Sequence, residues 1–212
     1  MGTNFERERE RMLREHLVAR DITDERVLSA MAEVPRERFV PERLAASAYE
    51  DHPLPLSDGQ TISQPYIVAA TLQAAAIDEH DVVLDIGTGS GYAAAVASKM
   101  AASVVSIERI ASLSQQAASV IRELGYDNIE LLVGDGAEGA RDLGPFDAIV
   151  CAAAVEQIPS SWSEQLTPGG RIVAPVGGRA GQRLRSIRRD ADGEIVETDL
   201  GGVVFVPLIS ES

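Results

Sequence analysis

Apolar residues recur at helical spacing in the N-terminal part of the chain. Residues 4–20 carry apolar side chains among charged neighbours, at intervals that place them on one face, and this predicts an amphipathic helix. The apolar side chains of this face are Met12, Leu13, Leu17 and Val18. A second helix is predicted to begin at Thr23 or Asp24, either of which can act as its N-cap, and to end before Pro35.

The next part of the chain is punctuated by proline. Residues 36–58 contain three prolines and are predicted to be irregular. A third helix is predicted to run through Ala76, with Ser63 able to act as its N-cap and Pro65 in its first turn.

From residue 81 onward, short apolar runs alternate with helical segments. The predicted strands are residues 82–86, 104–107, 129–133, 148–152 and 171–176, and the predicted helices are residues 92–100, 113–124 and 162–166. Near the end, residues 183–189 and 194–198 flank Asp192-Gly193, which is a hairpin signal, and residues 203–206 form a predicted last strand.

This order of elements predicts an α/β fold: a Rossmann-like, doubly wound, mostly parallel sheet with an antiparallel C-terminal edge and an N-terminal helical extension. We expect one domain over residues 1–212. Residues 1–80 are its helical extension and substrate segment, and residues 81–212 are its Rossmann-like core.

The charge balance limits the partners of the chain. Thirty-three acidic residues face nineteen basic ones, which gives a net charge of −14, and Lys99 is the single lysine. Such a surface repels nucleic acids, and the arginines of residues 183–189 are interpreted as a solvated strand and turn rather than a binding patch. At molar salt the Debye length falls to about 3 Å, so the composition also favours a high-salt, halophilic cytoplasm as a hypothesis.

Other features bear on location and cofactor class. No segment is apolar over a transmembrane length and the N-terminus is charged, so we expect a cytoplasmic protein without a membrane partner. Cys151 lies in an apolar run and is predicted to be buried. The three histidines are scattered, so we expect no metal site.

The most informative motif is the glycine-rich turn Gly87-Thr88-Gly89-Ser90-Gly91, which follows the strand ending Asp85-Ile86. A strand that passes through such a turn into a helix is typical of a ligand site at the helix N-terminus. In a dinucleotide fingerprint the third glycine would replace Tyr92, but here it comes one residue earlier. The spacing resembles the first motif of S-adenosylmethionine methyltransferases, with a purely structural turn as the alternative.

Residues at two further strand ends also favour S-adenosylmethionine as the ligand. Glu108 closes the next strand about 20 residues after the turn, where a carboxylate can accept hydrogen bonds from a ribose diol. Asp135 and Gly136 follow the third strand, where they can contact an adenine ring, although an aspartate before glycine is also an ordinary turn. We expect all three ends at one edge of the sheet.

The segment ahead of the turn resembles a particular family. Residues 59–65, Gly-Gln-Thr-Ile-Ser-Gln-Pro, are similar to a string found in protein-L-isoaspartate O-methyltransferases. The similarity extends to residues 33–36, 39–41, 82–92, 106–109, 134–136, 168–171 and 205–208, and thus covers about residues 10–208. One departure is Ala152-Ala153-Ala154, where the family often has Thr-Ala-Ala, so a polar contact near the ligand is missing or replaced.

The resemblance implies transfer of a methyl group from S-adenosylmethionine to the free α-carboxylate of L-isoaspartyl residues. The ester then closes to a succinimide without enzyme, which initiates repair of the damaged protein. The acceptor has a reference pKa of about 3.5 and is already an anionic nucleophile at neutral pH, so no general base is needed. Positioning and exclusion of water remain for the protein to provide.

The resemblance also implies the site residues. The hydroxyls of Ser63 and Thr61 are the expected catalytic groups, and Ser63 can be a helix N-cap as well. The expected cofactor-binding residues are Gln60, Thr61, Ile62, Asp85, Gly87, Thr88, Gly89, Ser90, Gly91, Glu108, Asp135 and Gly136. The expected partners are isoaspartyl-containing peptides and proteins, bound by a monomer. The alternatives are a methyltransferase for another carboxyl or an RNA acceptor, and a non-catalytic module that binds S-adenosylmethionine.

Overall fold

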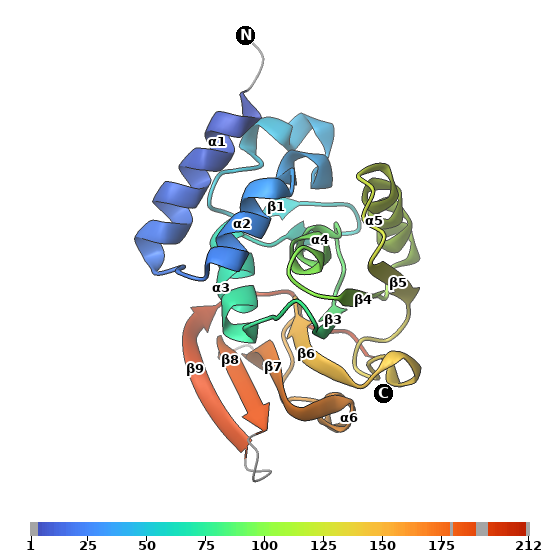
Figure 1. Ribbon diagram of the computed structural model, residues 1–212. Helices are drawn as coiled ribbons and strands as arrows, with labels where there is room; N and C mark the ends of the chain where they lie inside the picture. Colours follow the sequence, from blue (N-terminus) through green and yellow to red (C-terminus); the bar gives the residue numbers. More distant parts are fainter. Residues whose placement is uncertain (1–3, 179, 190–194, 211–212) are drawn as a thin grey trace.

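The N-terminal part of the chain is helical, as the apolar spacing predicts. The computed structural model describes residues 4–178, 180–189 and 195–210 (Figure 1). Helix α1 (Phe5–Arg11) continues without a break through a π-helical turn (Met12–Leu17) and a 3₁₀ turn (Val18–Arg20). Met12 and Leu17 are fully buried, but Val18 is 53% exposed, so its predicted place on the apolar face is wrong. The wider π-helical turn shifts the phase of the residues that follow it.

Helix α2 (Glu25–Glu33) begins where the sequence predicts, because the Asp24 side chain accepts a hydrogen bond from the Arg26 amide at 2.9 Å. The next segment is more regular than predicted. It forms two 3₁₀ helices (Arg36–Phe39 and Glu42–Ser47) and then strand β1 (Leu54–Pro55), which pairs antiparallel with β2 (Thr61–Ile62).

Helix α3 (Pro65–Ala75) has a different N-terminal cap from the predicted one. The N-cap position is Gln64, and the Tyr66 amide donates to Asp51 Oδ1 at 3.2 Å. Asp51 comes from the preceding irregular segment and takes the role expected of Ser63. The prediction of Ser63 as N-cap is therefore wrong, because Ser63 lies one residue too early in the chain.

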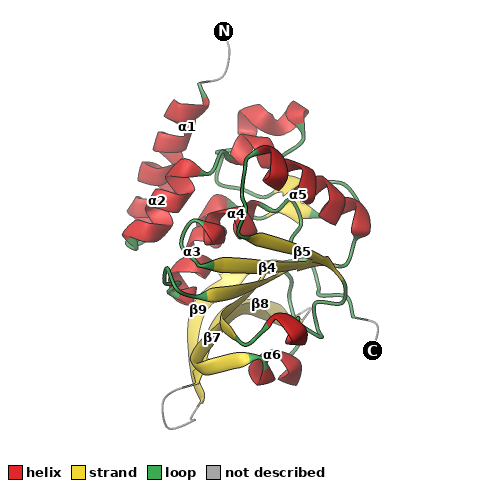
Figure 2. Ribbon diagram, turned by 45° about the vertical axis from the view of Figure 1, so that its right-hand side comes forward, coloured by secondary structure: helices red, strands yellow, loops and turns green. Residues whose placement is uncertain are grey.

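A seven-stranded sheet forms the centre of the molecule, in the order β5-β4-β3-β6-β7-β8-β9 (Figure 2). The strands are β3 (Val82–Ile86), β4 (Ser103–Glu108), β5 (Ile129–Val133), β6 (Phe146–Cys151), β7 (Leu166–Gly178), β8 (Gly181–Arg189) and β9 (Ile195–Val203). The first five in this spatial order are parallel, and β8 and β9 are antiparallel. This confirms the Rossmann-like sheet with an antiparallel C-terminal edge.

Helices and apolar clusters cover the sheet on both faces. Helices α2, α3, α4 (Tyr92–Ser98) and α5 (Ala111–Glu123) lie on one face over a large apolar cluster (Figures 1 and 2). The short helix α6 (Ser160–Glu164) and a 3₁₀ turn (Arg141–Leu143) lie on the other. Cys151 is buried in this second cluster, as predicted, and burial raises the pKa of its thiol to about 12.

Several element ends differ from the prediction. Leu166 belongs to β7 rather than to a helix, because it pairs with Phe146 ahead of a register shift in the ladder. Ala152 lies one residue beyond β6. Residues 203–206 do not form a separate strand, because β9 ends at Val203 and the backbone of Phe205 binds the Gln182 side chain instead.

The predicted hairpin strands do pair as β8 and β9, whereas Asp192-Gly193 and Glu194 lie outside the described residues. Two arginines of β8 pair with acidic residues of β9. Arg183 pairs with Asp199, and Arg185 lies 3.4 Å from Glu197. These pairs agree with a solvated, charge-balanced strand surface rather than a basic patch.

Candidate functional site

The site lies where the strand order of the sheet reverses. From β3 the chain moves outward to β4 and β5 and then returns to β6 on the other side of β3. Ligands of open α/β sheets bind at such a reversal, outside the carboxyl ends of the strands. Here the ends of β3 and β6 are close together, because a Cβ placed on Gly87 would lie 3.6 Å from Ala152 Cβ.

A pocket opens along these strand ends, and we call it the loop pocket. It encloses about 700 Å³ of space including its open mouth. Its lining residues are Gln60, Thr61, Ile86, Gly87, Gly89, Ile107, Glu108, Arg109, Ile110, Gly136, Ala152, Ala153, Val206, Pro207, Leu208 and Ile209. Thus the glycine turn, the second and third strand ends and the 59–65 segment meet at one place, as the sequence predicts.

The third glycine of the turn has a packing role as well as a conformational one. Gly91 has a φ of +86° and begins helix α4. A Cβ at this position would lie 3.1 Å from Ile121 Cδ1 and 3.2 Å from Ala117 Cβ. Gly91 therefore lets α5 pack directly against the turn.

Glu108 is held in place at the edge of the loop pocket. Its Oε2 accepts from the Gly89 amide and its Oε1 accepts from the Ile110 amide, both at 2.9 Å. Each carboxylate oxygen keeps a second acceptor site, since an ionised carboxylate has about four lone-pair positions. The side chain is thus fixed for a ligand that presents two hydroxyl groups.

Gly136 forms part of the opposite wall. A Cβ there would lie 2.5 Å from Ile86 Cγ2, so glycine is required. Its carbonyl accepts from Trp162 Nε1 at 2.9 Å, which fixes the orientation of this peptide. Asp135 does not line the pocket, and its Oδ1 accepts from the Ala137 amide at 2.9 Å, the turn geometry named as the alternative.

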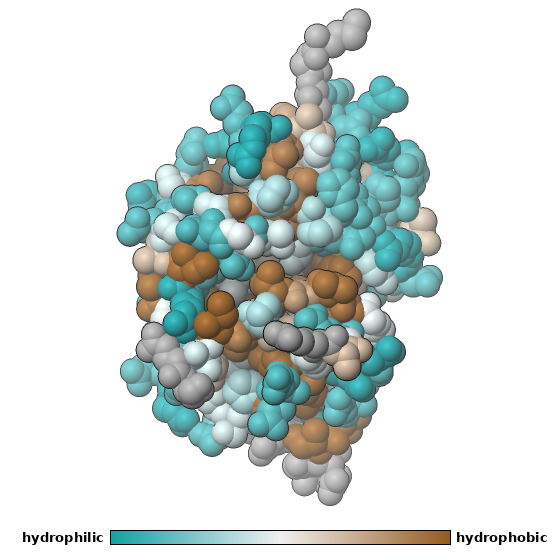
Figure 3. Space-filling view, turned by 180° about the vertical axis from the view of Figure 1, so that it is seen from behind, coloured by the Kyte–Doolittle hydropathy of each residue, from teal (hydrophilic) through white to brown (hydrophobic). Residues whose placement is uncertain are grey.

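The C-terminal segment, residues 206–209, closes the loop pocket on a further side. It crosses the end of β6, where Ala154 N donates to Val206 O at 2.8 Å and Leu208 N donates to Ala154 O at 2.7 Å. No residue chemistry in this segment indicated a pocket wall, apart from its place in the family resemblance. The surface seen from behind is mostly hydrophilic, with apolar side chains gathered across its middle (Figure 3).

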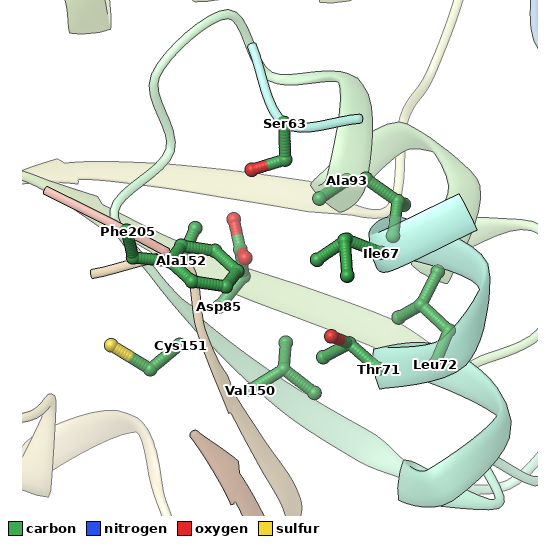
Figure 4. Close-up of a pocket in the computed structure, with 11 residues that line it drawn as sticks. Ser63, Ile67, Thr71, Leu72, Asp85, Ala93, Val150, Cys151, Ala152 and Phe205 are labelled. Carbon is green, nitrogen blue, oxygen red and sulfur yellow. The ribbon is translucent and has the colours of Figure 1, made fainter. Parts of the chain in front are cut away.

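A second, smaller cavity lies beside the loop pocket, and we call it the Ser63 pocket (Figure 4). It is lined by Ser63, Ile67, Val68, Thr71, Leu72, Asp85, Ala93, Val150, Cys151, Ala152 and Phe205. Ala152 lines both cavities, so they adjoin at the position where the family often has threonine.

The Asp85 carboxylate is the one ionisable oxygen group among the lining residues of the Ser63 pocket. It is 1% exposed and accepts from Ser106 Oγ at 2.7 Å, and Ser106 Oγ lies 2.6 Å from Thr88 Oγ1. Burial raises the pKa of Asp85 to about 6, the hydrogen bond from Ser106 lowers it, and the nearby Glu108 charge raises it. Among the described residues no cationic side chain pairs with this buried carboxylate, although burial favours such a partner.

Ser63 presents its hydroxyl to the same cavity as Asp85 (Figure 4). No hydrogen bond to the Ser63 hydroxyl is recorded among the described residues, which follows from the capping of α3 by Asp51. Thr61, two residues earlier, lines the loop pocket instead, while Ile62 between them is 4% exposed and packs in the core. The two expected catalytic hydroxyls thus belong to adjoining cavities.

The remaining expected cofactor residues shape the turn without lining the loop pocket. Thr88 is buried and bonded to Ser106. Ser90 lines a separate groove against α5 and accepts from the Tyr92 amide at 3.3 Å.

Arg36 is a residue of this region that sequence reasoning missed. Its side chain is fully buried, and it donates to the carbonyls of Ala48 and Ser63, each at 2.7 Å. Its guanidinium lies 4.7 Å from the centre of the Tyr92 ring. The sequence feature that could have identified Arg36 is its position as a charged residue between the apolar Val34 and Phe39, both of which are also buried.

The described residues contain no cluster of three or more His, Cys, Asp or Glu side chains arranged to hold a metal ion. None of the described helices is both long and apolar enough to cross a membrane.

Comparison with known proteins agrees with the geometry. Residues 7–212 match the family model for Protein-L-isoaspartate(D-aspartate) O-methyltransferase. The protein-L-isoaspartate O-methyltransferase of Methanoculleus marisnigri is 50% identical over 206 residues, 97% of this chain and 93% of that protein. The one of Brucella anthropi is 48% identical over 207 residues, 97% of this chain and 95% of that protein.

Solved structures give the same result. A protein-L-isoaspartate O-methyltransferase superposes with a TM-score of 0.84 and 28% identity, over 95% of this chain and 66% of that longer one. A putative Plasmodium falciparum enzyme of the same name, in complex with S-adenosyl-L-homocysteine, gives 0.82 and 25% identity over 98% of this chain and 99% of that one. This chain is therefore an S-adenosylmethionine-dependent enzyme that methylates isoaspartyl residues of proteins, and it belongs to the protein-L-isoaspartate O-methyltransferase family.

Proposed function

We propose that the loop pocket binds the adenosyl part of the methyl donor, and that its methionyl part reaches into the Ser63 pocket, where the damaged residue binds. The observation that carries this proposal is the contact between the two cavities at Ala152, with the free Ser63 hydroxyl and the buried Asp85 carboxylate both facing the second one. S-adenosylmethionine supplies an electrophilic methyl group on a sulfonium.

The donor would be held by groups that the fold has already oriented. Glu108 would accept from the ribose hydroxyls, and the Gly136 amide would face the adenine. Asp135, next to Gly136 but outside the pocket lining, would contact the adenine from the margin of the pocket. Asp85 would accept from the ammonium of the methionyl part, which is the cation that its buried carboxylate lacks. The turn of residues 87–91, together with residues 60–62, would enclose the rest of the S-adenosylmethionine molecule.

The acceptor needs positioning rather than activation. Its α-carboxylate is ionised at neutral pH, so an oxygen lone pair can form the new O–CH₃ bond while the S–CH₃ bond breaks. The Ser63 hydroxyl would donate to the other carboxylate oxygen and orient it without the charge neutralisation that a lysine would cause. Thr61, facing the adjoining cavity, would border the path between the two reactants.

Further proposals concern the whole chain. Residues 1–212 form one domain, in which residues 1–80 supply the acceptor segment and residues 81–212 the donor site. The enzyme acts as a cytoplasmic monomer on peptides and proteins and has no nucleic-acid or membrane partner. Its net charge of −14 and single lysine suit a high-salt, halophilic cytoplasm.

The proposed acceptor is tested by labelled methyl transfer from S-adenosylmethionine to an isoaspartyl peptide and to its normal aspartyl twin, at low and at molar KCl. We expect label on the isoaspartyl peptide alone, because only there is a free α-carboxylate available within the chain. Equal labelling of both peptides would indicate another carboxyl acceptor, and no labelling of either would indicate a non-catalytic binding module.

Ser63→Ala tests the acceptor role of the hydroxyl. Loss of one oriented donor in a reaction centre costs about a hundredfold to a thousandfold in turnover, so kcat should fall by about that much. Affinity for S-adenosylhomocysteine, measured by calorimetry, should remain close to the parent value. Ser119→Ala, which removes an exposed hydroxyl on α5, is the matched control. Comparable losses of kcat and cofactor affinity would contradict the assignment.

Asp85→Asn tests whether the buried Asp85 carboxylate destabilises the folded protein and binds the donor. The pKa of Asp85 is about 6 in the folded protein and near 3.9 in the unfolded one. The ionised carboxylate therefore destabilises the folded state most above pH 6, and this penalty shrinks as the pH falls toward 4. The difference between the two values is worth roughly 3 kcal/mol. Urea unfolding should therefore show Asp85→Asn to be more stable than the parent at pH 8, with a smaller difference at pH 5, and with weaker S-adenosylhomocysteine binding.

Asp142→Asn removes an exposed carboxylate and controls for the change in net charge. A variant at Asp85 that is less stable than the parent at pH 8, or that binds S-adenosylhomocysteine equally well, would contradict the proposed role.

The high-salt proposal predicts that the free energy of unfolding in urea rises between low salt and molar KCl. Screening at a Debye length of about 3 Å reduces repulsion among the surplus carboxylates. Urea melts followed by circular dichroism at both salt concentrations measure the effect. Greater stability at low salt would count against adaptation to a high-salt cytoplasm.

A further inference from the structure

Arg36 connects two parts of the site that are distant in sequence. Its Nη2 donates to the Ser63 carbonyl at 2.7 Å, at the start of the segment that leads into α3. Its guanidinium stacks over the ring of Tyr92, the first residue of α4, which directly follows the glycine turn. One side chain therefore touches both the proposed acceptor residue and the helix that begins at the donor turn.

Burial of the Arg36 guanidinium lowers the stability of the folded protein. The Arg36 side chain is fully buried, and the salt bridges recorded among the described residues include none to it. Its Nη1 is buried without a hydrogen-bond partner. An apolar side chain of similar volume often stabilises a protein more than a buried charge does, so packing gives no reason for arginine here.

The geometry of the guanidinium offers a reason. It is planar and presents donors in fixed directions, so it can hold one carbonyl at a set angle while its face rests on an aromatic ring. The Nε atom donates to the Ala48 carbonyl at 2.7 Å, which anchors the side chain from a third segment. Rotation of the Ser63–Gln64 peptide would break this bond, so Arg36 restrains the backbone that carries the Ser63 side chain.

We propose that Arg36 is a positioning residue for methyl transfer, which sets the orientation of Ser63 relative to the glycine turn. This inference rests on the proposed role of Ser63 at the acceptor carboxylate. Arg36 is not itself a lining residue of either cavity and acts through the Ser63 carbonyl.

Arg36→Lys and Arg36→Met test the proposal on the full-length enzyme. Lysine keeps the charge but lacks the planar fork, and methionine keeps an apolar stem of similar length. Misplacement of a reacting group by about 1 Å can cost on the order of 100-fold, so kcat for the isoaspartyl peptide should fall at least about tenfold in both variants. Affinity for S-adenosylhomocysteine and the peptide KM should change far less than kcat.

Arg171→Lys is the matched control. Arg171 is also largely buried and holds the carbonyls of Ala75 and Ala76 at the opposite end of the same helix, α3, with Asp81 as its ion-pair partner. Loss of these hydrogen bonds and of the ion pair should lower the melting temperature and leave kcat near the parent value. A general loss of order in α3 would lower kcat in both Arg36 and Arg171 variants.

A double-mutant cycle separates the inference from the function on which it rests. If Arg36 acts through Ser63, Arg36→Lys should lower kcat in the parent but cause little further loss in Ser63→Ala. Parent-like kcat in both Arg36 variants, full additivity with Ser63→Ala, or parallel loss of kcat and S-adenosylhomocysteine affinity would each overturn the role of Arg36. Parent-like kcat in Ser63→Ala alone would instead overturn the proposed function of Ser63. Circular dichroism at the assay temperature verifies folding, and methionine serves if the lysine variant does not fold.

Discussion

The placement of one short extended segment over the end of the parallel sheet is the constraint on which the site depends. Within this segment Thr61 lines one cavity, Ile62 packs in the core and Ser63 lines the adjoining cavity. The pairing of β1 with β2 and the capping of α3 by Asp51 fix the two ends of the segment. Because the acceptor carboxylate and the sulfonium are both reactive at neutral pH, holding them in line is the main task left to the protein.

The buried polar groups of the site work against stability. Among the described residues, Asp85 is buried with a hydrogen bond from Ser106 and without a cationic partner. Arg36 is buried against two carbonyls and the Tyr92 ring, and its Nη1 has no hydrogen-bond partner there. The large apolar cluster under helices α2 to α5 compensates for such groups. A cationic ligand at Asp85 would relieve part of this penalty, so the apo protein is expected to gain stability when the donor binds.

Local patterns in the sequence were sufficient for the sheet, the glycine turn and the family, because each depends on residues close together in the chain. Features made by distant residues were not predictable in this way. Asp51 caps α3 from an earlier segment, so Ser63 was wrongly assigned as the cap. The bonds from Arg36 to Ala48 and Ser63, and the wall of residues 206–209, exist only after the chain has folded. The prediction that Val18 lies on the apolar face was wrong because a π-helical turn changes the helical phase ahead of it.

We propose that Ser63 holds the acceptor carboxylate beside the cavity lined by Asp85, next to the donor. A crystal structure of the enzyme with S-adenosylhomocysteine and an isoaspartyl peptide tests it most directly. The account predicts the Ser63 hydroxyl within about 3.2 Å of one oxygen of the α-carboxylate, with the other oxygen facing the sulfur. A carboxylate held by other groups, with the Ser63 hydroxyl turned away from it, would contradict the account.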